Sequence, residues 1–225
     1  MFLRKGDSMV RTIVCYGDSN THGYCGGGTA RFDETKRWPC LLQELLGSDF
    51  RIYEEGLSGR TTVLDDPLCE GLNGLTMLFP CLMTHEPLDL LILMLGTNDL
   101  KERFHMTAGN IAKGVEVLVQ KAKQMSVWRE MPHILVVAPA PVGEEYRLTA
   151  VAEEMGRGCA EKSRRLSGFL EETAGQNACG FLDAGRIEGL QMQTEDYMHL
   201  DERSHRLLAK ALAEYIDEWK IWDEK

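Results

Sequence analysis

Four short polar segments of the sequence contain residue types that together could cleave an ester. They read GDSNTHG (17–23), GLSGRTT (56–62), GTND (96–99) and DYMHL (196–200). The first offers a serine hydroxyl as a nucleophile, and the last offers a histidine that can take its proton and an aspartate that can orient that histidine. The other two offer N–H donors for the oxyanion that forms on the attacked carbonyl. This chemistry requires that the fold bring all four segments together.

Ser19 is the candidate nucleophile. The tripeptide Gly-Asp-Ser occurs at 6–8 and again at 17–19, and only the second copy follows an apolar run. We therefore expect Ser19 at a tight turn after a strand, with its hydroxyl exposed and its own N–H available to an oxyanion, and we expect Ser8 to have no function. Taken alone, the tripeptide fits a turn or a helix cap better than an active site.

His199 is the candidate base, because Asp196 precedes it by three residues and one turn can carry both side chains. The carboxylate then accepts a hydrogen bond from one ring nitrogen and leaves the other free to act as a base. Taken alone, this pair fits a surface turn. The remaining histidines are expected at the wrong edge of the sheet, in the last helix, or without a suitably spaced acid: His85, His133, His205, His22 and His105.

The oxyanion donors are expected to be the N–H groups of Ser19 and Gly59 and the side-chain amide of Asn98. Turn chemistry is the alternative for two of them, with Asn98 as a turn residue and Gly59 as a residue that needs a positive φ. We expect Asp99 to be structural, as a cap of the segment that follows it. Two aromatic residues in helical contexts are expected in the core: Trp38 and Phe79.

Apolar runs and helical spacing alternate along the chain and so predict the elements that position these residues. The apolar runs lie at 11–16, 50–54, 88–95, 133–138 and 179–183, and the helical segments include 38–46, 107–125, 150–173 and 202–219. Runs that are apolar on both faces indicate a parallel sheet covered by helices on both sides. We predict a three-layer α/β/α sandwich with a doubly wound, mostly parallel five-stranded sheet, and the polar segments follow the carboxyl ends of its strands, where such folds bind ligands.

Length and composition narrow the class of protein. The 225 residues predict one domain over 9–225, after an N-terminal extension at 1–8. A net charge of −10 argues against nucleic acid as a partner, and no apolar run is long enough to span a membrane. Seven cysteines without a Cys-x-x-Cys pair, and no export signal, favour reduced thiols and a cytoplasmic location. Neither a metal-spaced His/Cys cluster nor a glycine-rich phosphate loop is present, so no metal and no cofactor are predicted.

The four segments, in this order, resemble the SGNH or GDSL hydrolases, whose name records a Ser, Gly, Asn and His in successive blocks. Here these residues are Ser19, Gly59, Asn98 and His199. The runs EEGLSGRTT and LDLLILMLGTNDLK resemble in particular the bacterial arylesterases and acyltransferases of the family, and the likeness extends from Met9 over nearly the whole chain. It implies the flavodoxin-like fold of these enzymes.

The resemblance implies a serine esterase for short-chain carboxylic esters, with an acyl-enzyme on Ser19, a base at His199, an orienting group at Asp196, and acyl transfer to alcohols as a second outcome. A carbohydrate O-deacetylase is the alternative within the family, and a non-catalytic small-molecule-binding module is the alternative outside it. The resemblance also implies homo-oligomers, with 26–36 and 62–84 as candidate interface segments. Two departures put the substrate preference in doubt: Asn20 replaces the usual leucine, and Tyr197 replaces a frequent glycine.

Overall fold

A computed structural model describes residues 9–26 and 31–219. The predicted extension at 1–8, with Ser8, and residues 27–30 of the glycine-rich loop lie outside the described residues. Within the described part of the chain, no helix is long and apolar enough to cross a membrane.

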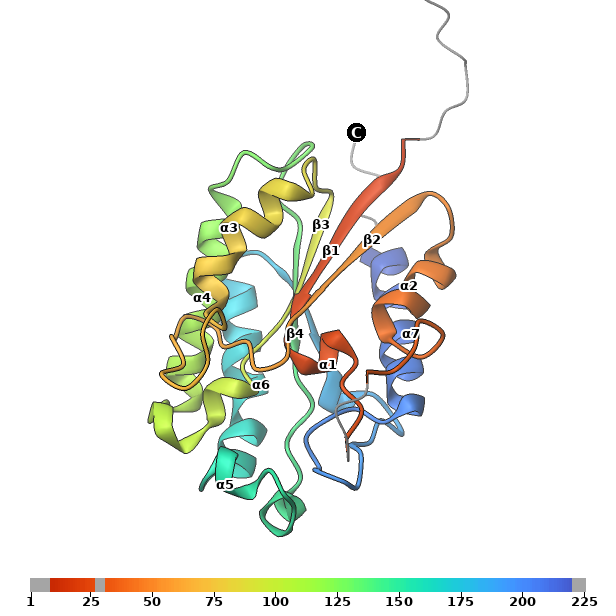
Figure 1. Ribbon diagram of the computed structural model, residues 1–225. Coiled ribbons are helices and arrows are strands. Elements are labelled where there is room, and N and C mark those ends of the chain that lie inside the picture. Colours follow the sequence, from red (N-terminus) through yellow and green to blue (C-terminus); the bar gives the residue numbers. More distant parts are fainter. Residues whose placement is uncertain (1–8, 27–30, 220–225) are drawn as a thin grey trace, which may run out of the picture.

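A five-stranded parallel sheet forms the middle layer, as predicted (Figure 1). Its strands are β1 (Arg11–Gly17), β2 (Phe50–Gly56), β3 (Leu90–Met94), β4 (Ile134–Ala138) and β5 (Gly180–Asp183). They lie in the order β2-β1-β3-β4-β5, and every neighbouring pair is parallel. The order reverses at β1, so the fold is doubly wound and presents its switch point between β1 and β3.

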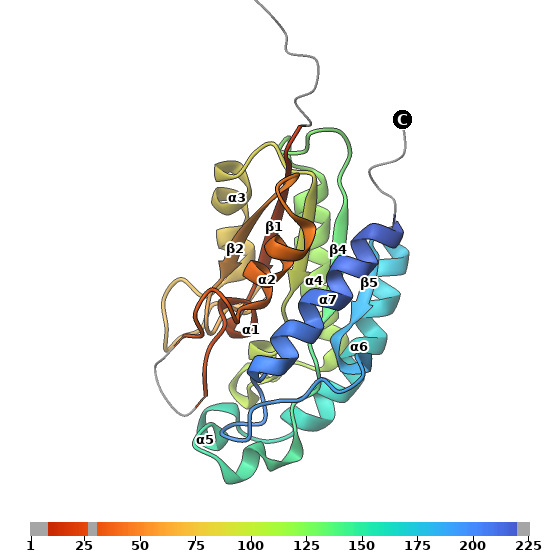
Figure 2. The ribbon, with the colours of Figure 1, turned by 90° about the vertical axis from the view of Figure 1, so that its right-hand side faces the viewer.

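Helices cover both faces of the sheet (Figures 1 and 2). One face carries α3 (Gly74–Thr84), α4 (Ala108–Lys123) and α6 (Cys159–Gln176), and the other carries α2 (Trp38–Leu46) and α7 (Glu202–Trp219). Each face encloses its own apolar cluster, and β3 and β4 are buried along their whole length. The three-layer prediction is confirmed.

Two helical predictions were wrong in detail. The segment predicted as one helix over 150–173 is broken into α5 (Ala152–Met155) and α6, because Gly156 and Gly158 between them adopt positive φ angles of 69° and 76°. Phe79 was expected in a helical context, but no bounds were predicted for helix α3, which begins at a glycine and contains Pro80. It forms nevertheless because the side chain of Asn73 caps its first turn by accepting from two backbone N–H groups.

The two aromatic residues expected in the core behave differently. Trp38 is buried in the cluster between the sheet and α7, as predicted. Phe79 is 52% exposed on α3, so its assignment to the core was wrong. Helical spacing alone did not identify which side of α3 faces the sheet, because both sides of that helix carry apolar residues.

The remaining helical turns are short and follow the sheet edges. They are α1 (Ser19–His22) and the 3₁₀ turns η1 (Asn98–Leu100), η2 (Glu102–Phe104), η3 (Glu144–Leu148) and η4 (Ala184–Arg186). Both α1 and η1 start just beyond the carboxyl ends of β1 and β3, the two strands at the switch point. Their first residues are Ser19 and Asn98, so the fold places two of the predicted site residues side by side at that edge.

Candidate active site

Ser19 is the first residue of α1 and lies directly after β1. The side chain of Asp18 caps this short helix by accepting from the N–H of Asn20 at 3.0 Å. Gly17 permits the sharp turn, since a Cβ there would lie 2.9 Å from the carbonyl oxygen of Met94 and still closer to Thr21. The N–H of Ser19 has no hydrogen-bond acceptor among the described residues and stays available to a ligand.

Ser19, His199 and Asp196 form one hydrogen-bonded chain. The Nε2 of His199 lies 2.8 Å from the Oγ of Ser19, and its Nδ1 lies 2.7 Å from the Oδ2 of Asp196. All three residues are buried, with at most 6% of each exposed. An imidazole held between a carboxylate and a hydroxyl in this way can accept the hydroxyl proton and be stabilised as an imidazolium. The structure thus brings together three residues that are up to 180 positions apart.

The segment that carries His199 is held by the aspartate itself. The Oδ1 of Asp196 accepts from the N–H groups of Met198 and His199, both at 2.9 Å, while Oδ2 faces the ring. Burial raises the pKa of Asp196, but these hydrogen bonds and the nearby imidazole outweigh it, and the net shift of the pKa is downward. The Asp196 carboxylate is therefore ionised at neutral pH.

Asn20 connects the nucleophile turn to the histidine segment. Its Oδ1 accepts from the N–H of Leu200 at 2.8 Å, and its Nδ2 donates to the carbonyl of Met198 at 3.3 Å. These are the two neighbours of His199 in the chain, and Asn20 itself is buried. A leucine could make neither bond. Asn20, in place of the usual leucine, therefore adds two hydrogen bonds between the serine turn and the segment that carries His199.

Asn98 and Gly59 flank the same edge. The Nδ2 of Asn98 donates one hydrogen bond, of 3.1 Å, to the carbonyl of Arg60, which leaves its second amide hydrogen for a ligand. Gly59 has a φ of 87°, as a turn glycine would, and its N–H has no acceptor in the described part of the chain. The site and turn interpretations of these two residues are thus compatible.

Arg60 is a residue that the sequence analysis missed. Its guanidinium lies 4.0 Å from the ring centroid of Tyr16 and donates to the carbonyls of Gly17 and Glu55. It therefore connects the ends of β1 and β2 beneath the segment that carries Gly59. Its side chain is buried, and no motif interpretation predicted that a cation would lie there.

Asp99 is structural, as predicted, but it does not cap the segment that follows it. Both carboxylate oxygens accept from the N–H of Thr62 at 3.0 Å, and one also accepts from the Thr62 hydroxyl at 2.5 Å. Asp99 thereby joins the second and third polar segments. Burial raises the pKa of Asp99 to about 6, and burial likewise raises the pKa of Asp18 to about 6 despite the bond from Asn20 and the nearby imidazole of His199.

Tyr24, rather than Tyr197, is the aromatic residue beside the candidate base. Its ring centroid lies 4.4 Å from that of His199. The side chain of Gln193 holds this loop by donating to the carbonyls of Tyr24 and Leu200. Tyr197 is half-buried and packs against the apolar cluster on the face of the sheet that carries α3, α4 and α6. Nothing in the sequence pattern distinguished Tyr24, because its contact depends on the loop between α1 and α2.

No other histidine of the described residues hydrogen-bonds to Ser19. Across the described ranges, the side chains with the spacing of a three-ligand metal site are Glu55, Cys81 and His85, and none of them belongs to the polar chain at Ser19. The arrangement at Ser19 therefore offers acid–base and nucleophilic chemistry.

Comparison with known proteins agrees with this arrangement. The sequence model of the GDSL-like lipase/acylhydrolase family matches residues 15–207. The chain belongs to this family. Its members are acylhydrolases by their description, so this GDSL-family protein is a hydrolase of the esterase class. No curated protein matches the chain.

Solved structures similar to this GDSL-family chain include esterases of two kinds. The M. smegmatis aryl esterase shares 36% sequence identity, with a TM-score of 0.83 over 93% of this chain and 99% of that one. A carbohydrate acetylesterase from Sinorhizobium meliloti also shares 36%, with a TM-score of 0.85 over 93% and 99% of the two chains. Another carbohydrate acetylesterase family member from that organism shares 38%, with a TM-score of 0.84 over 93% and 98%.

Proposed function

We propose that the protein hydrolyses short-chain carboxylic esters through an acyl-enzyme on Ser19. The observation that carries this proposal is the unbroken chain from the Ser19 hydroxyl through both nitrogens of His199 to the Asp196 carboxylate. A non-catalytic binding module, the alternative from another class, has no use for an imidazole held between these two groups. The esterases among the similar structures support the same conclusion.

In the first half of the proposed reaction, the Oγ of Ser19 attacks the ester carbonyl while the Nε2 of His199 takes its proton. The resulting imidazolium then gives that proton to the leaving alcohol. Asp196 holds the ring by its Nδ1–H and stabilises the positive charge. Asp18 adds a second buried carboxyl near the imidazolium, and its own pKa of about 6 leaves it mostly ionised at neutral pH.

The negative charge that develops on the carbonyl oxygen is assigned to three donors: the N–H groups of Ser19 and Gly59 and the amide of Asn98. Two observations support this assignment. The two N–H groups have no acceptor among the described residues, and Asn98 is anchored through the carbonyl of Arg60, next to Gly59. Donors fixed before the reaction stabilise the transition state without having to reorganise.

In the second half, water or another alcohol attacks the acyl-enzyme, with His199 again as the base. Apolar side chains at the entrance of the site would favour transfer to an alcohol by excluding water. Leu57 is exposed, but Leu95 and Met198 are buried in the core cluster and line no entrance. The transfer proposal therefore depends on the acyl-enzyme itself, which any alcohol that enters the site can intercept.

The transfer reaction can be tested with benzyl alcohol and two activated acetate esters that differ in their leaving group. We expect benzyl acetate in water, in a ratio to acetate that is the same for both donors, because both pass through one acetyl-enzyme. Chromatography that finds only acetate at every alcohol concentration would remove the transferase half of the proposal. A ratio that follows the leaving group would argue against a common intermediate.

The substrate is defined by its acyl group and by the alcohol that carries it, which can be an aryl alcohol or a sugar. Aryl esters and acetylated sugars are both represented among the similar proteins, and we propose small acyl groups on either carrier. A panel of nitrophenyl esters of increasing chain length, measured beside acetylated sugars, distinguishes the two carriers. We expect kcat/KM to be highest for acetate among the nitrophenyl esters; a maximum at long chains would contradict a short-chain esterase.

We also retain three predictions that concern the whole molecule: one domain over 9–225, a cytoplasmic location, and assembly into homo-oligomers. The predicted interface segment 62–84 contains three exposed apolar side chains, which favours a contact there: Leu68, Met77 and Phe79. The other candidate, 26–36, falls partly outside the described residues. Light scattering on the purified protein measures the assembly, and charged substitutions at Phe79 and Leu68 are expected to dissociate it.

A further inference from the structure

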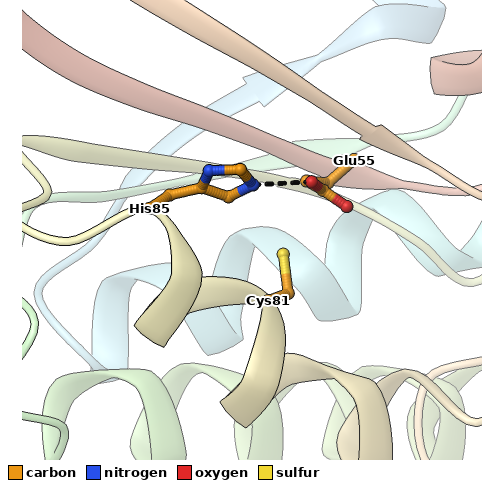
Figure 3. A group of neighbouring side chains, drawn as sticks. All are labelled: Glu55, Cys81 and His85. Atoms are coloured by element: carbon orange, nitrogen blue, oxygen red, sulfur yellow. Dashed lines mark hydrogen bonds and ion pairs between the residues drawn. The ribbon is translucent and has the colours of Figure 1, made fainter.

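A second cluster of reactive side chains lies between β2 and α3 (Figure 3). Glu55 is the penultimate residue of β2, while Cys81 and His85 are four residues apart around the end of α3, so that both project from one side of that helix. One ligand atom from each lies within 4.8 Å of the other two. The proposed ester hydrolysis uses none of these groups.

The three side chains offer a carboxylate oxygen, a thiol sulfur and an imidazole nitrogen. The Nε2 of His85 lies 2.6 Å from the Oε1 of Glu55, and Cys81 faces the pair in Figure 3. This combination is typical of zinc sites, whereas magnesium and calcium select oxygen ligands alone. Tetrahedral coordination at zinc bond lengths needs ligand atoms roughly 3.3 to 3.6 Å apart, and the three ligand atoms here lie within 4.8 Å of one another.

The surroundings fix the ring of His85 and leave it accessible from the surface. The ring of His85 is stacked on Tyr53 at 4.0 Å between centroids, which fixes its plane. The cluster is half-buried, and a hollow of about 260 Å³ opens onto Tyr53 and His85. Of the three side chains, His85 is the one that lines this hollow, and water can complete the coordination of a cation bound there.

The other face of β2 provides a comparison. Glu54 points away from Glu55 because side chains alternate along a strand, and it too meets a cysteine, Cys40, at 3.1 Å. There the third member is Arg37, whose guanidinium donates two hydrogen bonds to the Glu54 carboxylate at 2.8 and 2.9 Å. A guanidinium cannot ligate a metal and already neutralises the glutamate. On the Glu55 side an imidazole stands in that place, and an imidazole can ligate.

We propose that Glu55, Cys81 and His85 bind a zinc ion, with water as the fourth ligand. On binding, the Cys81 thiol loses its proton to solvent and its sulfur bonds the metal, while neutral His85 ligates through Nε2 in place of its contact with Glu55. The metal would join β2 to α3, the two elements that flank the segment 57–73 with Gly59 in it. Its predicted effect is to stabilise that segment of the folded protein.

Cobalt(II) is the probe, because it enters zinc sites and gives a sulfur-to-metal charge-transfer absorption when a thiolate binds it. We expect metal-free protein to bind one cobalt ion per chain with this absorption, and equimolar zinc to abolish it. Zinc should also raise the melting temperature in a concentration-dependent manner, since a ligand that binds only the folded state stabilises it. Both readouts are independent of esterase activity.

The variants assign the ligands. Cys81→Ser is expected to lose the absorption, and His85→Gln to weaken cobalt binding. The matched control Cys40→Ser, on the other face of β2, and Cys69→Ser, which removes an exposed thiol, are expected to keep both. Far-UV circular dichroism confirms that each variant is folded. Absence of the absorption in the parent protein, or its persistence in folded Cys81→Ser, would overturn the proposal.

Discussion

The molecule contains two carboxylate–imidazole pairs of almost equal length with different surroundings. Asp196 and His199 are 2.7 Å apart, and Glu55 and His85 are 2.6 Å apart. The first pair is buried and presents its second ring nitrogen to the Ser19 hydroxyl. The second pair is more exposed, with Tyr53 stacked on the ring and Cys81 nearby. A carboxylate–imidazole pair therefore acts as a catalytic base only if a group that can lose a proton, such as the Ser19 hydroxyl, faces the second ring nitrogen.

The largest expected effect comes from removing one imidazole at a time. His199→Ala is expected to lower kcat by roughly 10⁴- to 10⁶-fold, because no other group can take the serine proton. His85→Ala is expected to retain most of the activity at equal protein concentration. Assays with a nitrophenyl ester measure both. Comparable losses in the two variants would show that the pairs are not functionally distinct.

The Asp196–His199 pair also differs from the Glu55–His85 pair because oxyanion donors are proposed to lie beside it, around Ser19. Asn98→Ala is expected to lower kcat roughly 100- to 1000-fold, about 2.7 to 4 kcal/mol, with little change in KM, because its bond to the oxyanion forms mainly in the transition state. The exposed helix residue Asn110→Ala serves as the control and is expected to be silent. Near-normal kcat in Asn98→Ala would assign Asn98 to the turn alone.

A smaller effect is expected from Asn20, which positions one pair and has no counterpart at the other. Asn20→Leu leaves the carbonyl of Met198 and the N–H of Leu200 without their partner, so His199 loses its fixed distance from Ser19. We expect kcat to fall roughly 10- to 100-fold with KM nearly unchanged. A loss of stability with unchanged kcat in the folded variant would make Asn20 structural only.

A third imidazole, His205, has no hydrogen-bonded carboxylate in the described chain and shows what burial alone does. It is fully buried between Trp38, Phe32 and Asp201, accepts from the N–H of Trp38 at 3.3 Å, and burial lowers its pKa to about 4. The unfolded chain therefore takes up this proton near pH 6.5 and the folded chain only near pH 4. Stability from His205 is present above pH 6.5 and is lost as the pH falls toward 4, by roughly 3 kcal/mol.

The substitution His205→Gln isolates the contribution of His205 to the pH dependence of the free energy of unfolding. It keeps a hydrogen-bonding side chain and cannot titrate, so the free energy of unfolding should fall less on acidification than it does for the parent. The difference matters because Asp18 and Asp99 act in the opposite direction: their pKa values near 6 mean that the folded state gains their protons first and is relieved by acid. Urea unfolding between pH 7 and 4.5 gives both slopes, and parallel curves would contradict the assignment.

The sequence predicted the sheet and the hydrogen-bonded series Ser19–His199–Asp196 well, because both follow from local patterns. Apolar runs identified every strand of the described sheet, and the edge rule for parallel sheets then placed Ser19 and Asn98 together. The three-residue spacing from Asp196 to His199, together with their position after the last strand, predicted their contact. These inferences needed only the direction of the strands and the reach of one turn.

What the sequence could not predict depends on loops and on which side of an element faces inward. Tyr24 contacts His199 because Gln193 holds its loop, and Arg60 supports the second segment through carbonyl groups that carry no residue signature. The break at Gly156 and Gly158 and the outward-facing Phe79 on α3 have the same origin. The hydrophobic pattern reports neither the backbone conformation at such glycines nor which side of a helix that is apolar on both sides faces inward.

The central claim is that Ser19 is the nucleophile that His199 activates. Incubation with a fluorophosphonate, followed by peptide mass spectrometry, tests it most directly. We expect one label per chain on the peptide that contains Ser19, no label in Ser19→Ala, and labelling in Ser8→Ala at the rate of the parent protein. A label on any other residue, or one that persists in folded Ser19→Ala, would contradict it.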